Sequence, residues 1–198
     1  MKASDLQVFE SGELRVEFSR ISDRWKHTIG IVSDGQFIPL LESDESPPDD
    51  DPSLTPALQE LHLEGRGARI VAMLVGMSGE SHWSLSAEFA PDHGRAFFDV
   101  ACRRRGHNAI LGSSYSAKAN CVVSLNERSG IEVRNNALQP WLIVESPYPT
   151  GITGGYTVDT DQGSVSEASP GLMIGPGEPD GGASQTLRWH YTVTVLQR

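Results

Sequence analysis

The chain has 198 residues, of which 38% are hydrophobic and 21% charged, enough for one large domain with a sizeable core. Its formal net charge of −10 disfavours nucleic acid and anionic membrane surfaces as partners, because both attract basic proteins. The sequence has no apolar run of about 18 residues and no signal-peptide core near its start, so a cytoplasmic location is the default expectation.

The chain opens with three short segments that read as strands. Residues 13–20 alternate apolar and polar side chains, and residues 24–32 place Trp25, His27, Ile29 and Ile31 on one face. A turn at Ser33-Asp34-Gly35 precedes a further short strand at 36–41. Together these segments predict an antiparallel meander.

The next stretch, 42–56, is acidic, rich in proline and almost without apolar side chains. It predicts an exposed loop, because it cannot bury enough surface to offset its ordering entropy. Residues 55–58 then suggest a turn or short helix, and residues 59–64 a strand. On that strand Glu60, His62 and Glu64 would share one face.

The most apolar run is Arg69 to Gly76. It predicts either a central strand covered on both faces or a strand at an interface.

The best-specified unit is a hairpin over residues 82–103. Pairing residues whose numbers sum to 185 gives one wholly apolar face, with Trp83 opposite Cys102 and Leu85 opposite Val100. A slip of one residue would destroy that segregation, so the sequence itself selects this register.

The second half of the chain adds weaker strands and one strong one. Strands are expected at 109–116 and 141–145, and a second hairpin at 121–127 and 131–135. The region 147–184 is rich in Gly, Pro and Ser, with a long loop expected at 175–184. The alternation over residues 187–195 predicts a long strand that pairs with an earlier one.

About a dozen short strands with little helix predict a single all-β domain over residues 1–198. The expected architecture is a large antiparallel two-sheet sandwich of jelly-roll or supersandwich type. Two cysteines are too few for a disulfide scaffold, and Cys102 falls on the predicted core face, so buried free thiols are expected at Cys102 and Cys121.

The polar face of the 82–103 hairpin is the first candidate site. It gathers His82, Glu88, Asp99 and Arg103, with His82 opposite Arg103. Such a group suits a small polar ligand, a carbohydrate or a carboxylate, because arginine binds anions with two parallel hydrogen bonds. The alternative is a solvated face stabilised by cross-strand charge pairs.

Aromatic side chains are the second candidate, because sugar-binding sandwiches stack pyranose rings on Trp and Tyr. Trp83, Trp141 and Trp189 lie in strongly alternating strands and are expected in the core. Trp25, flanked by two basic residues, and Tyr148 are the candidates for an exposed platform.

Metal and cofactor chemistry find little support. Glu60, His62 and Glu64 are ligand types on alternate strand positions, but no established metal motif accompanies them, so neither a metal nor a cofactor is expected. Phosphate-binding loops and a nucleophile elbow are also missing from the sequence.

Three functions remain open from the sequence. The leading hypothesis is a non-catalytic module that binds a small polar ligand or a protein partner through the hairpin's polar face. The second is a sugar-modifying enzyme of epimerase or mutarotase type, with His82 as base and Glu88, Asp99 or Glu145 as acid. The third is an assembly protein that forms a homodimer through residues 69–76.

Overall fold

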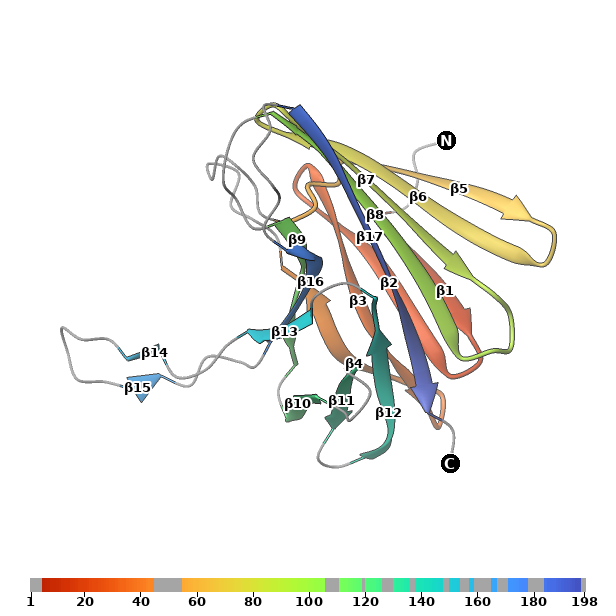
Figure 1. Cartoon of the computed structure of the whole chain (residues 1–198). Helices are drawn as coiled ribbons and strands as arrows, with labels where there is room; N and C mark the ends of the chain where they lie inside the picture. The colour runs from red at the N-terminus through yellow and green to blue at the C-terminus, as the bar shows by residue number, and fades with distance from the viewer. Residues whose placement is uncertain are drawn as a thin grey trace.

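Two antiparallel sheets packed face to face form the molecule (Figure 1), which confirms the predicted large two-sheet sandwich. The structure is a computed structural model. It describes residues 5–44, 55–105, 111–118, 120–125, 130–135, 138–147, 150–153, 157–158, 165–166, 171–177 and 184–196.

Sheet A has seven strands in the described part of the chain, and the second, third and fourth form the predicted meander. In spatial order the strands are β1 (Leu6–Ser11), β2 (Leu14–Ile21), β3 (Arg24–Ser33), β4 (Gln36–Ser43), β9 (Leu111–Ala117), β16 (Gly171–Gly177) and β13 (Thr150–Thr153).

Sheet B has eight strands within the same described residues, and its long strand β17 lies between β12 and β8. The predicted pairing of this strand with earlier ones is therefore confirmed. In spatial order the strands are β10 (Cys121–Leu125), β11 (Ile131–Asn135), β12 (Leu138–Glu145), β17 (Ser184–Leu196), β8 (Arg95–Arg105), β7 (Ser81–Phe89), β6 (Arg69–Ser78) and β5 (Glu60–Arg66).

A small third sheet pairs β14 (Thr157–Val158) with β15 (Val165–Ser166). No helix occurs among the residues that the structure describes, so none of them belongs to a helix that is long and apolar enough to cross a membrane.

The core lies between the two sheets, because the strands that alternate turn their apolar side chains inward. Phe9 of β1 stacks on Phe89 of β7 with 4.8 Å between ring centroids, which ties one edge of sheet A to sheet B. Trp83 and Trp189 are buried as expected, at 2% and 0% exposure. The side chain of Trp141 lies outside the described part.

Segment 55–59 crosses from one sheet to the other and closes one end of the sandwich. The amide of Trp25 in β3 donates to the carbonyl of Leu58 at 2.7 Å, and the amide of Gln59 donates to Val75 in β6 at 2.8 Å. These backbone groups of segment 55–59 bond to strands β3 and β6 rather than to one another. Of the two alternatives expected at 55–58, a turn or a short helix, the helix is therefore wrong.

Described residues at the start of both predicted loops belong to strands. Glu42 and Ser43 belong to β4, since they pair with Ser116 and Tyr115 of β9; residues 45–54 lie outside the described residues. Likewise residues 175–177 continue β16 and Ser184 begins β17, which leaves 178–183 outside the description.

Strand β6 is not covered on both faces, so that half of the prediction for 69–76 is wrong. It lies next to the terminal strand β5, and Ile70 and Val75 are 48% and 42% exposed. Its apolar composition therefore does not reflect a central position.

Candidate functional site

The 82–103 hairpin has the register that its apolar face predicts. In β7 and β8 His82 lies opposite Arg103, Ser86 opposite Asp99, and Trp83 opposite Cys102. The side chains of β7 are alternately buried and accessible, so His82 and Glu88 lie on the outer face of sheet B. Asp99 and Arg103 lie on the same face, because they pair directly with Ser86 and His82.

The two carboxylates of this face bind arginines from neighbouring strands. Glu88 pairs with Nη1 of Arg69 in β6 at 2.5 Å. Asp99 accepts two hydrogen bonds from Arg188 of β17, one from Nε at 2.7 Å and a second from Nη2. The predicted group is thus divided between two ion pairs, and neither pair includes His82 or Arg103.

A shallow depression of about 470 Å³ lies on the outer face over β6, β7, β8 and β17. It brings the Asp99–Arg188 pair beside apolar side chains of β6. Of the hairpin residues predicted for the site, Asp99 lines it, whereas His82, Glu88 and Arg103 do not. The lining residues are Met73, Leu74, Val75, Ser84, Leu85, Ser86, Asp99, Ala101, Thr186 and Arg188.

A second depression, of about 390 Å³, lies on the same face across β17. Phe97 and His190 are in ring contact there at 5.5 Å between centroids, and Ser146 Oγ donates to the His190 carbonyl at 3.0 Å. Because His190 is opposite Asp99 in the sheet, one cross-strand pair adjoins both depressions. The second depression is lined by Phe97, Gly130, Glu145, Ser146, Pro147, His190 and Thr192.

Trp25 is not a platform, and that prediction is wrong. Its side chain lies on the inner face of β3 and is 3% exposed. Segment 55–59 runs past this end of β3, where the backbone amide of Trp25 donates to the carbonyl of Leu58. The basic neighbours suggested an exposed position, but Arg24 is itself buried at 8%. Tyr148, the other platform candidate, lies outside the described residues.

Sequence reasoning missed Arg188 and His190. The alternation of the last strand placed both on its polar face, which was the available signal. Their partner strand β8 lies far away in the sequence, since Arg188 and Asp99 are 89 positions apart. Without that long-range pairing, nothing in the sequence joins them to the hairpin.

Glu60, His62 and Glu64 share the outer face of β5 and are all exposed. His62 Nε2 lies 3.5 Å from Glu60 Oε2. Within the part of the chain that is described, no group of three or more His, Cys, Asp or Glu residues is arranged to hold a metal ion.

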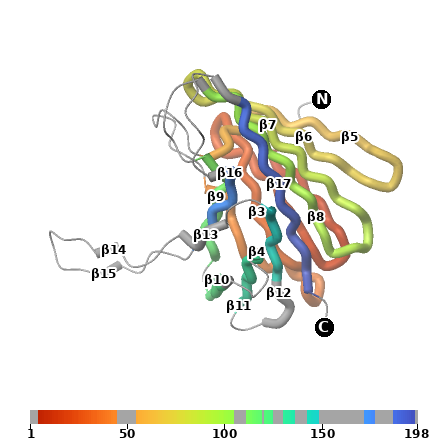
Figure 2. The backbone as a smooth tube through the Cα atoms, in the orientation of Figure 1, coloured from red at the N-terminus to blue at the C-terminus, as the bar shows by residue number. Residues whose placement is uncertain are grey.

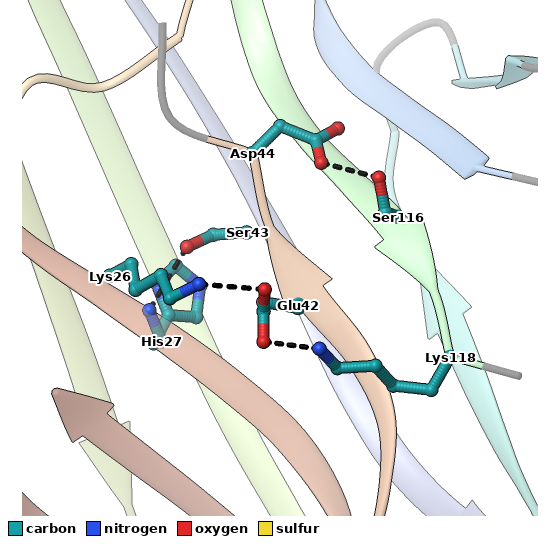
Figure 3. Close-up of polar contacts among 7 residues, drawn as sticks. All are labelled: Lys26, His27, Glu42, Ser43, Asp44, Ser116 and Lys118. Atoms are coloured by element: carbon teal, nitrogen blue, oxygen red, sulfur yellow. Dashed lines mark hydrogen bonds and ion pairs between the residues drawn. The ribbon is translucent and has the colours of Figure 1, made fainter. Parts of the chain in front are cut away.

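The outer face of sheet A carries a separate polar cluster (Figure 3). Glu42 of β4 bonds to Lys26 of β3 at 2.7 Å and to Lys118 beyond β9, while Asp44 accepts from Ser116 at 2.5 Å. Partial burial raises the pKa of Glu42, but the two lysines outweigh it, so its pKa lies below the usual value. The cluster links β3, β4 and the β9 region, and both carboxylates, those of Glu42 and Asp44, already have partners within the chain.

A sealed polar group lies in the core between the sheets. His27 Nε2 and Tyr115 Oη are 2.7 Å apart, and Trp189 Nε1 donates to Ser113 Oγ at 3.1 Å. Burial lowers the pKa of His27 to about 3, so the imidazole is neutral at pH 7. Every one of these side chains is buried, which makes them structural rather than accessible to a ligand.

The fold is a β-sandwich, and the outer face of sheet B carries two adjacent depressions over β6, β7, β8, β17 and β12. Comparison with known families finds no model that matches the chain, and comparison with curated proteins finds no match.

Proposed function

We propose that this domain is a non-catalytic module that binds a carbohydrate on the outer face of sheet B. The observation that carries the proposal is the Asp99–Arg188 pair, which lines the first depression beside His190 of the second, with apolar surface in both depressions. The pair is uneven in exposure: the side chain of Arg188 is 69% exposed and that of Asp99 18%.

A bidentate Asp–Arg pair suits sugar hydroxyls. The outer carboxylate lone pairs can accept from one hydroxyl while the exposed guanidinium donates to the next. A ligand carboxylate bound to the same guanidinium would lie close to the Asp99 carboxylate, and the two negative charges would repel each other. The geometry therefore favours a neutral polyhydroxyl ligand over the carboxylate that the sequence left open.

The apolar surfaces on either side complement the faces of a sugar ring. Met73 and Val75 line the first depression, and the Phe97 ring, 37% exposed, lines the second. Aliphatic and aromatic groups bind the C–H faces of pyranoses, while the polar groups fix orientation. Two adjacent depressions suit a ligand of more than one sugar unit, which would extend toward His82 and Arg103.

The test is a glycan-binding screen on the full chain, followed by calorimetry with the best ligand. Asp99→Asn and Arg188→Gln should each weaken binding about tenfold or more, because each removes charged hydrogen bonds. Glu132→Gln is the matched control, since Glu132 forms an exposed-face ion pair with Arg134 at 2.6 Å on β11, outside both depressions.

The control should bind like the unchanged protein. His82→Ala and Arg103→Ala should weaken only the longer oligosaccharides. A blank screen, or a ligand whose affinity is unchanged by Asp99→Asn and Arg188→Gln alike, would reject the proposal.

A further inference from the structure

Strand β5 ends sheet B and has one neighbour, β6. Figure 2 shows β5 at the margin of the sheet, where the turn that joins it to β6 projects to the right. Its other side therefore presents unpaired backbone amides and carbonyls among the described residues. Such an edge is a template for one more antiparallel strand.

The hairpin also carries apolar side chains that the domain leaves uncovered. Leu63 and Ile70, on the side that faces sheet A, are 51% and 48% exposed, and Met77, on the outer side, is 47% exposed. Exposed apolar groups gathered at a free edge mark a contact surface rather than a protected edge.

The charges of β5 fit a second copy of the same strand. An antiparallel pair centred on Leu63 joins residues whose numbers sum to 126, and it is the register that pairs all seven residues of the strand. On the outer face it sets Glu60 opposite Arg66 of the second copy, and His62 opposite Glu64. Leu63 meets its own counterpart on the inner face.

Neighbouring registers lack this match. Directly opposed residues must share a face, so the strand can slip only in steps of two. A slip of two residues one way places Glu60 opposite Glu64, and a slip the other way places Glu64 opposite itself. Like charges directly opposed destabilise a strand pair.

We infer that two copies of this chain associate through β5, antiparallel and centred on Leu63, so that their eight-stranded sheets become continuous. The contact is isologous, as a two-fold axis requires: Glu60 meets Arg66 twice. The occupant of this edge is thus a second copy, selected by the charge pattern. The inference is independent of the carbohydrate site.

Sedimentation equilibrium on the full chain tests it. Glu60→Arg and Arg66→Glu should each raise the dimer dissociation constant about tenfold or more, because each places like charges opposite one another at two symmetric positions. The double substitution Glu60→Arg/Arg66→Glu restores opposite charges and should bring the constant back to within about threefold.

These substitutions should not unfold the domain, because the side chains of Glu60 and Arg66 are 70% and 57% exposed. Cross-linking supplies a second measurement. Leu63→Cys should give a covalent dimer with a short bis-maleimide, whereas Ile21→Cys, 49% exposed on β2 of the other sheet, should not.

A chain that stays monomeric at all concentrations would overturn the inference. A dimer whose dissociation constant is unchanged by Glu60→Arg and by Arg66→Glu would also overturn it. So would a double substitution that does not restore the dissociation constant, or cross-linking through Ile21→Cys as strong as through Leu63→Cys.

Discussion

Tyr115 of sheet A and Tyr191 of sheet B share a hydrogen bond between their hydroxyls in the centre of the core. Burial raises the pKa of Tyr191 to about 12 and that of Tyr115 well above its usual value, so both phenols stay protonated. His27 bonds to the Tyr115 hydroxyl, and the ring of Phe98 stacks on Tyr191 at 5.0 Å between centroids. This contact is a polar link between the two sheets.

Tyr115→Phe should lower the free energy of unfolding by about 1–3 kcal/mol, because it leaves His27 Nε2 and the Tyr191 hydroxyl without this partner in a dry core. Urea denaturation measures the change. Tyr115→Phe/Tyr191→Phe should cost less than the two single changes together, since the second removes a hydroxyl that has already lost its hydrogen bond to Tyr115. Additive costs would show that the hydroxyls do not interact.

The buried imidazole of His27 should make stability depend on pH. Its pKa is about 3 in the folded protein and near 6.5 when unfolded, so the unfolded chain binds the proton first as pH falls. Stability should therefore decrease below about pH 6.5, by about 2 kcal/mol from this group between pH 7 and pH 5.

His27→Gln supplies the comparison. The variant retains a polar group near Tyr115 but has no titration in this window. Urea midpoints at pH 5, 6 and 7 should fall more steeply for the unchanged protein than for His27→Gln. Parallel curves would mean that His27 is accessible to protons in the folded state.

The two thiols should be unreactive in the folded protein. Cys102 is 0% exposed and Cys121 7%, both are free, and burial raises the pKa of Cys102 to about 12. A thiol reagent such as Ellman's at pH 8 should modify neither rapidly, yet should modify both in guanidinium. Fast modification of one thiol before unfolding would contradict this burial.

Gly76 and Gly65 form a matched pair for the segment that crosses between the sheets. A Cβ on Gly76 would lie 2.0 Å from the Ala57 carbonyl oxygen, whereas a Cβ on Gly65 would meet nothing within 4 Å. Gly76→Ala should cost about 1–3 kcal/mol by displacing residues 55–59. Gly65→Ala should be neutral or slightly stabilising in thermal unfolding. Similar effects of the two substitutions would show that residues 55–59 can move away from position 76 without a loss of stability.

Alternation alone sufficed for the central hairpin. Each residue of β7 has one partner in β8, and a shift by one residue would have turned Trp83 and Leu85 to solvent, so the register followed from the sequence. The same reasoning located β2 and most of β17. It works wherever one face of a strand is buried and the partner strand is near in sequence.

The rest depended on contacts between distant segments. β1 was not predicted, because its apolar residues lie on both faces: Leu6 and Val8 are exposed, whereas Phe9 points inward and reaches Phe89. Trp25 was misplaced because the segment that covers its end of β3 comes about thirty residues later. Arg188 was missed for the same reason: its role depends on a pairing with β8 that no local pattern encodes.

The position of β17 between β12 and β8 has a kinetic consequence. Strands β5 to β8 can form from successive hairpins, and so can β10 to β12, but each group ends in an open edge until β17 enters between them. Insertion of a long central strand with distant partners is slow, since loop closure precedes any gain from pairing. We therefore expect refolding to be limited by this step, with β8 and β12 as the edges at which the partly folded chain aggregates.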